Sequence, residues 1–159
     1  MRVLCAIGMR DGPEMIGQIQ QILGSSLDLL ILHVIDTEPR LGLQKALGGP
    51  GVLRPGERPR QGQAINAAEE AAGKAALEET FQAAGKAQFH AETMMQRGRP
   101  EQVIIQTGRD WHADLIVIWA SEGLQGRPQI GPASVGHTAR FVLDHAPCNV
   151  LYLRKGPLF

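Results

Sequence analysis

Short apolar runs recur along the chain and alternate with longer stretches in which apolar residues have helical spacing. There are five such runs: Val3–Ile7, Leu29–Ile35, Gln88–Met95, Leu115–Trp119 and Val150–Leu153. Four of them are continuous, which is the pattern of a strand covered on both faces. The run at 88–95 alternates only in part, as expected of a less buried strand. The pattern therefore predicts five strands.

The stretch after the first run has the features of a helix start. Asp11 is a suitable N-cap, Pro13 falls in the first turn, and Glu14 is placed to bond back to the cap. The apolar face of this helix consists of Met15, Ile16, Ile19, Ile22 and Leu23. Gly24 follows that face, so we expect it to be the left-handed C-cap.

Three further helices are predicted between the later runs. Residues 64–84 are rich in Ala, Glu, Lys, Gln and Leu, which favours a helix ended by Gly85. We expect the side that lies on the sheet to be the alanine face: Ala68, Ala72, Ala75 and Ala76. A short helix should begin at Pro100 and end at Gly108. A last helix is expected from the apolar positions Val135, Ala139, Val142, Leu143 and Ala146.

Strands that alternate with helices favour one parallel sheet with helices on both faces. We therefore predict an α/β fold of the doubly wound, Rossmann-like class, with five strands in a single domain over residues 1–159. Residues 37–63 are rich in Gly, Pro and Arg, so we expect an insertion there with no long element. Two interpretations of this insertion stay open: a mobile loop, or a lid or partner contact.

Composition excludes several classes of function. The chain has 16 basic and 16 acidic residues, so nothing in its charge indicates nucleic-acid binding. The apolar runs are too short to span a membrane, and we expect a cytoplasmic protein. Cys5 and Cys148 are the two cysteines, and both are expected to be reduced thiols. The spacing of the histidines does not suggest a zinc site: His90, His112, His137 and His145. No catalytic motif is found, and we do not expect an enzyme.

A glycine-rich segment lies between the fourth strand and the last helix. Gly123 and Gly126 are separated by two residues, and Gly136 follows after nine more. Glycines before a helix N-terminus suit an anion, because backbone N–H groups can then surround it. Arg127 could add charge and Ser134 a hydroxyl. The alternative is that the glycines only form turns.

This segment resembles the universal stress protein family. ATP-binding members of that family carry the same spacing of three glycines, a helix that ends in a phrase like His145-Ala146-Pro147-Cys148, and a final apolar strand. The resemblance implies the same fold. It also implies ATP or another adenine nucleotide as ligand, with or without Mg²⁺. The family contacts adenine with backbone at the position of Val34, and it forms homodimers through the strand at Val150–Leu153.

Two residues differ from the family pattern in the expected site. His137 stands where the family has Ser or Thr, with Thr138 one place later. Gly8 stands where ATP-binding members usually carry an Asp that meets the adenosine. His137 is expected in the first turn of the last helix. There it could donate to a phosphate as a neutral imidazole. Alternatively, it could only fill the loop, which Trp119 to Glu122 make about four residues longer than in the family.

Two main hypotheses of function follow. The first is a regulatory protein of the stress response that binds an adenine nucleotide through Gly123, Gly126 and Gly136. The alternative is a dimeric interaction module that binds no nucleotide and contacts a protein partner through the insertion at 37–63.

Overall fold

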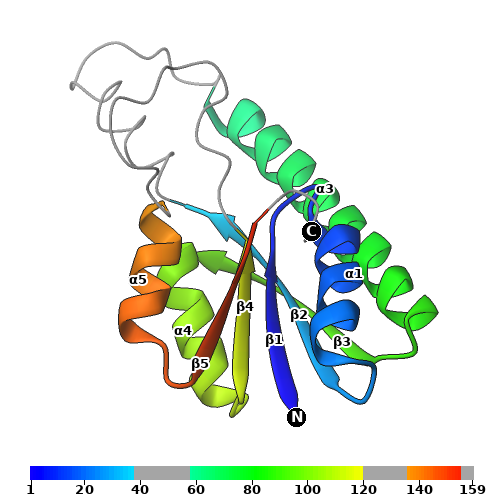
Figure 1. The fold of residues 1–159 in the computed structure, drawn as a ribbon. Coiled ribbons are helices and arrows are strands. Elements are labelled where there is room, and N and C mark those ends of the chain that lie inside the picture. Colours follow the sequence, from blue (N-terminus) through cyan, green and yellow to red (C-terminus); the bar gives the residue numbers. More distant parts are fainter. Residues whose placement is uncertain (38–57, 120–135, 155–159) are drawn as a thin grey trace, which may run out of the picture.

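The computed structural model describes residues 1–37, 58–119 and 136–154 (Figure 1). Its elements along the chain are β1 (Arg2–Ile7), α1 (Gly12–Leu23), β2 (Asp28–Asp36), α3 (Arg58–Lys86), β3 (His90–Gly98), α4 (Pro100–Asp110), β4 (Leu115–Trp119), α5 (His137–His145) and β5 (Asn149–Leu153). All five predicted strands are confirmed, with both ends of β4 as predicted and no end of any strand shifted by more than three residues.

The strands form one sheet in the order β3-β2-β1-β4-β5, and each neighbouring pair is parallel. β1 is the central strand, with Ile7 opposite His33 of β2 and Cys5 opposite Val117 of β4. The chain moves outward from β1 to β2 and β3, then returns to the other side of β1 for β4 and β5. The order of strands therefore reverses between β1 and β4, where ligands bind in doubly wound folds.

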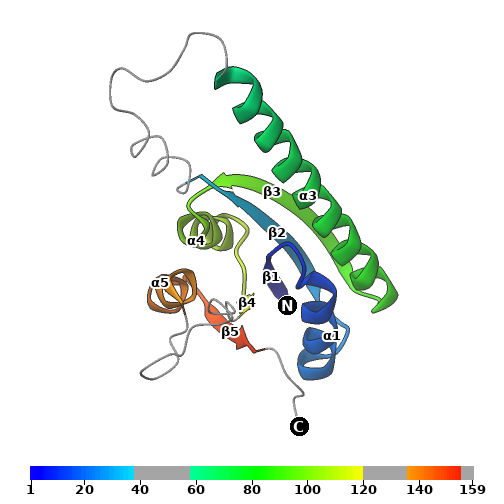
Figure 2. The same ribbon diagram turned by 90° about the horizontal axis from the view of Figure 1, so that it is seen from above.

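The helices cover both faces of this sheet, as predicted. Figure 2 shows α1 and α3 on one face and α4 and α5 on the other. Alternate residues of β1 supply the two cores: Val3 and Cys5 pack with α1 and α3, and Leu4 packs with α4 and α5. All three side chains are fully buried. A strand with two covered faces has to be apolar at every position, which explains the continuous apolar runs.

α1 and α3 approach each other closely at a glycine. A methyl group added to Gly12 would lie 2.8 Å from Cβ of Thr80 and closer still to its hydroxyl. Thr80 is fully buried, and its hydroxyl donates a hydrogen bond of 2.6 Å to the carbonyl oxygen of Ala76. Thr80 therefore cannot move aside, and only glycine fits at the start of α1.

α3 differs from the prediction at its start and in the face that it buries. It begins at Arg58, so the expected absence of a long element over 37–63 is wrong for residues 58–63. Pro59 is compatible with a first helical turn, where no N–H is needed. The predicted alanine face is also wrong for Ala68, Ala72 and Ala75, which are exposed, whereas Ala76 is buried as predicted. The buried positions are Gly73, Ala76, Leu77, Thr80 and Ala84.

α3 and α4 also continue past the glycines that were expected to end them. The residue with left-handed backbone conformation after α3 is Gln88, with φ of 61°, and after α4 it is His112, with φ of 53°. After α3, the N–H of Phe89 donates to the carbonyl of Ala84, and the N–H of Gln88 donates to that of Gly85. This pair of bonds is the Schellman motif, and the same pair follows α4. Gly108 lies inside α4 instead, where an added methyl would be 2.9 Å from Ile116.

The predicted ends of α1 are confirmed in position, but the side-chain cap predicted at its start is not formed. The helix starts directly after Asp11, yet this residue makes no side-chain cap hydrogen bond. At the other end Gly24 has the expected positive φ of 79° and its N–H donates to the carbonyl of Gln20. The capping box predicted at Asp11 is therefore wrong, and the carboxylate lies elsewhere.

β5 is an edge strand of the sheet, paired only with β4 among the described residues. Val150, Leu151 and Tyr152 are each half-buried there. The homodimer expected through this strand stays a prediction. Within the described ranges, none of the helices has the length and apolar character that crossing a membrane requires.

The glycine contact between α1 and α3 predicts opposite effects of two substitutions in one helix. Gly12→Ala should lower the free energy of unfolding by about 1–3 kcal/mol, because the added methyl overlaps the fixed Thr80 side chain. Gly17→Ala should raise it by about 0.5–1 kcal/mol, because Gly17 is exposed with nothing within 4 Å and alanine favours the helix. Urea denaturation measures both, and equal effects of the two variants would contradict the close contact.

Candidate functional site

A cavity of about 810 Å³ lies at the carboxyl edge of the sheet. It is bounded by the ends of β1, β2 and β4 and by the starts of α1, α4 and α5. The predicted site residues that line it are Gly8, Val34, Gly136, His137 and Thr138. Its volume is in the range usual for small-molecule sites. The remaining predicted residues, Gly123, Gly126, Arg127 and Ser134, lie outside the described part of the chain.

One side of the cavity is the N-terminus of α5. Gly136 is the N-cap with φ of 86°, and as a glycine it has no side chain with which to cap the helix. The first N–H groups of a helix have no partner within it, and the helix dipole adds partial positive charge there. Thr138 adds a hydroxyl to the same side of the cavity. This side is therefore suited to an anionic group.

His137 is the first residue of α5, as predicted. Its side chain is 81% exposed, and its Nε2 lies 3.8 Å from Oε1 of Glu101. Glu101 is in the first turn of α4 and its side chain is only 8% exposed. The imidazole is therefore placed between a buried carboxylate and the mouth of the cavity.

The side of the cavity around β1 and β2 carries carboxylates instead. Asp11 precedes α1, Asp36 ends β2, and Glu69 comes from α3. The described lining contains one cationic side chain that is always charged, Arg10. Carboxylates accept hydrogen bonds from hydroxyl and amino groups and repel anions. The two sides of the cavity therefore differ in the groups that they can bind.

Asp11 lies close to the place where a carboxylate was expected. The sequence has Gly8 at that place, but Oδ2 of Asp11 lies 3.3 Å from the position that a Cβ on Gly8 would take. The carboxylate that does not cap α1 is therefore directed back toward the end of β1. A carboxylate is present close to the expected place, although it comes from a residue three positions later.

Trp119 is the last residue of β4 and also lines the cavity. It is half-buried, and its indole Nε1–H is enclosed with no hydrogen-bond partner in the described part of the chain. The other tryptophan, Trp111, lies toward the amino edge of the sheet, where the guanidinium of Arg2 sits 4.8 Å from its ring centre. The two tryptophans therefore lie at opposite edges of the sheet.

His33 is a core histidine with a backbone partner. It is 3% exposed, and its Nδ1 lies 3.3 Å from the carbonyl oxygen of Ile7. Because a carbonyl can only accept, Nδ1 must carry the proton and donate. Nε2 has no hydrogen-bond partner among the described residues.

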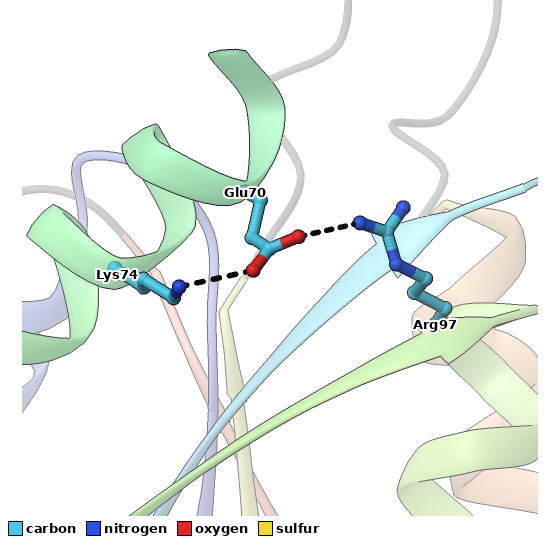
Figure 3. Close-up of polar contacts among 3 residues, drawn as sticks. All are labelled: Glu70, Lys74 and Arg97. Atoms are coloured by element: carbon cyan, nitrogen blue, oxygen red, sulfur yellow. Dashed lines mark hydrogen bonds and ion pairs between the residues drawn. The ribbon is translucent and has the colours of Figure 1, made fainter. Parts of the chain in front are cut away.

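A group of charged side chains ties α3 to the end of β3 beside the cavity (Figure 3). Oε1 of Glu70 lies 3.0 Å from Nζ of Lys74, and Oε2 lies 2.9 Å from Nη2 of Arg97. Hydrogen bonds from Lys74 and then from Arg97 lower the pKa of the Glu70 carboxyl below its ordinary value. Glu69, the preceding residue, lines the cavity, so the clasp of Glu70, Lys74 and Arg97 holds that part of α3 in place.

The two cysteines lie away from this chemistry. Burial raises the pKa of Cys5 to about 12, and burial together with the charge of Asp114 raises that of Cys148. Both side chains are free thiols in the structure. A raised pKa keeps a thiol protonated and poorly reactive at neutral pH. No group of three or more potential metal ligands occurs in the described ranges.

Sequence reasoning missed several residues of this site. Asp11, Asp36 and Trp119 each lie at or just after the carboxyl end of a predicted strand, and that position could have identified them. Glu69 and Glu101 belong to helices whose approach to the cavity depends on tertiary packing. No local pattern in the sequence distinguishes them from the exposed glutamates.

Comparison with known proteins gives a consistent picture. Residues 1–154 match the model of the universal stress protein family. A segment of 62 residues is 36% identical to universal stress protein E of Photorhabdus laumondii. That match covers 39% of this chain and 18% of the relative, so the chain spans only a small part of that relative's length.

Solved structures share the fold over nearly the whole chain. A universal stress protein family protein from Arabidopsis thaliana with AMP bound has a TM-score of 0.64 and 18% identity, covering 98% of this chain and 92% of its own. A universal stress protein in complex with cAMP has a TM-score of 0.58 and 16% identity, covering 97% and 96%. At these identities the likeness shows the fold, and the nucleotides belong to those two proteins.

The clasp of Glu70, Lys74 and Arg97 predicts a pH-dependent contribution to stability. The folded pKa of Glu70 lies below the unfolded value of about 4.3, so the charged form favours folding above that pH. The difference in unfolding free energy between wild type and Glu70→Gln should be present at pH 7. It should disappear as the pH falls through the folded pKa.

Urea denaturation at a series of pH values measures this difference. Because the group is exposed, 0.5 M salt should reduce it at pH 7. A difference that grew on acidification would be the wrong sign and would contradict the assigned role.

Proposed function

Since this chain belongs to the universal stress protein family, we propose that it is a regulatory protein that binds an adenine nucleotide in the cavity at the carboxyl edge of its sheet. The observation that carries the proposal is the polarity of the cavity. The N-terminus of α5 lies on one side of the switch point between β1 and β4. Asp11, Asp36 and Glu69 lie on the other.

A nucleotide has the same polarity. Its phosphate is anionic and suits a helix N-terminus, where backbone N–H groups and the dipole favour negative charge. Its ribose hydroxyls and adenine amino group are donors, which suit carboxylates and backbone carbonyls. A phosphate placed among the three carboxylates would be repelled, so the cavity favours one direction of binding.

The residues of the cavity take separate roles in this proposal. Asp11 accepts from a ribose hydroxyl in place of the carboxylate missing at Gly8. The backbone at Val34 and the indole of Trp119 border the base. Thr138 and the first N–H groups of α5 hold the phosphate, and His137 lies beside them with Glu101 behind its ring. Bound AMP and cAMP in two proteins of this fold support the choice of an adenine nucleotide.

Thermal unfolding with and without nucleotide tests the proposal directly. A ligand present at a hundred times its dissociation constant should stabilise the protein by about 2.7 kcal/mol. For a domain of this size the melting temperature should rise by about 5–11 °C. AMP, cAMP and ATP with Mg²⁺ are compared with GTP, and adenine ligands should give the larger rise.

Tryptophan fluorescence provides a second measurement of the same binding. Trp111→Phe leaves Trp119 as the remaining indole, so adenine nucleotides should change the fluorescence of that variant. Trp119→Phe, which retains Trp111 at the opposite edge, is the control and should respond little. No rise in melting temperature and no fluorescence change with any nucleotide would overturn the proposal and favour the interaction module.

The role of Asp11 predicts a loss and a rescue. Asp11→Asn should weaken nucleotide binding by about 10- to 100-fold, because a hydrogen bond to a charged group is worth about 1.5–3 kcal/mol. Adding Gly8→Asp to that variant should restore part of the affinity by returning the carboxylate to the neighbouring position. Isothermal titration measures both.

A matched control for this pair is Asp28→Asn. Asp28 lies at the opposite end of β2, where its carboxylate is 3.3 Å from Nδ1 of His90. This variant should bind nucleotide as the wild type does. If Asp11→Asn bound equally well, the carboxylate would have no role in the ligand.

A further inference from the structure

The buried side chain of His33 connects two walls of the cavity. Its hydrogen bond runs from β2 to the carbonyl of Ile7, the last residue of β1. The next residue, Gly8, lines the cavity and leads through the β1–α1 loop to Asp11. His33 therefore touches the chain at the point where it leaves the sheet and enters the site.

The other edge of the same imidazole faces α3. A methyl added to Gly73 would lie 2.7 Å from Cδ2 of His33 and 3.0 Å from its Nε2. It would also lie 3.1 Å from the sulfur of Met95, the strand neighbour of His33. Only glycine lets α3 come this close to the imidazole.

α3 in turn forms part of the cavity one turn earlier. Glu69 precedes Gly73 by four residues, which places the two on the same side of the helix. Glu69 lines the cavity, while Gly73 rests on His33. The imidazole thus lies between the β1–α1 loop and the helix that carries Glu69.

We propose that His33 is a positioning residue that sets the separation of these two walls, with Gly73 giving it the room to do so. The carboxylates of Asp11 and Glu69 would then meet a nucleotide at a distance fixed by the imidazole. The inference rests on the proposed function, since it concerns how well that site is formed.

The alternative is that His33 only packs in the core, and a second glycine distinguishes this interpretation from the proposed one. Gly108 of α4 makes the same kind of contact, with an added methyl 2.9 Å from Cδ1 of Ile116. Neither Gly108 nor Ile116 lines the cavity. Gly73→Ala and Gly108→Ala are therefore matched variants, both in helices and both against a strand side chain, but only Gly73 lies against a side chain that lines the cavity, that of His33.

The expected result is a difference in binding at similar loss of stability. Both variants should unfold at lower temperature than the wild type. Gly73→Ala should weaken AMP binding by about tenfold, a difference of about 1.4 kcal/mol, and Gly108→Ala should leave it within about twofold. Isothermal titration with AMP, well below the melting temperatures, measures the dissociation constants.

Variants of the imidazole test the hydrogen bond itself. His33→Asn retains a donor that can reach the carbonyl of Ile7 and should keep binding within about threefold, whereas His33→Leu should weaken it by about tenfold. In combination with Asp11→Asn, Gly73→Ala should cause little further loss, because contacts that act through one another are not additive. A purely structural role would give additive losses.

Each outcome has one meaning. If the wild type binds no nucleotide, the proposed function fails and this inference with it. If the wild type binds AMP but Gly73→Ala and Gly108→Ala lose affinity equally, the inference alone is overturned. If His33→Leu does not fold, the two glycine variants and the combination of Gly73→Ala with Asp11→Asn decide whether His33 positions the site.

Discussion

The burial of β1 on both faces is the constraint on which the rest of the structure depends. Val3, Leu4 and Cys5 are fully enclosed, so helices have to cover each side of the sheet. β1 also pairs along both of its edges, with β2 on one and β4 on the other. The helices that follow β1 and β4, α1 and α5, cover opposite faces, and the crevice lies between them where the strand order reverses (Figure 2). The cavity is a consequence of how the core is covered, and its chemistry depends on the residues that follow each strand.

Glycines that allow close helix contacts refine this arrangement. Gly12 and Gly108 let α1 and α4 approach their neighbours where a methyl would not fit, and Gly73 does the same for α3 above His33. Such contacts place polar groups of distant segments around one ligand-sized space. The polarity of that space follows: carboxylates gather near β1 and β2, and the N-terminus of α5 lies near β4.

The fold was readable from the sequence because each buried strand is a continuous apolar run, and the ends of α1 were marked by Asp11 and Gly24. Helix ends at Gln88 and His112 were not readable, since the left-handed residues there are not glycine. In the site, Gly8, Gly136 and His137 were expected from motif spacing. Asp11 was assigned to a helix cap, and Glu101 was missed because its contact with His137 exists only after α4 and α5 pack together.

The amino and carboxyl edges of the sheet should differ in how well they tolerate insertions and deletions. The Schellman turns that end α3 and α4 lie at the less tolerant, amino edge. Both turns lead directly into strands at the amino edge, so each connection there is a few residues long and closed by its own hydrogen bonds. The two longest connections between described elements, 37–57 and 120–136, both follow the carboxyl ends of strands. Insertions and deletions among relatives should therefore accumulate at the carboxyl edge, which lets ligand preference diverge during evolution while the folding unit stays the same.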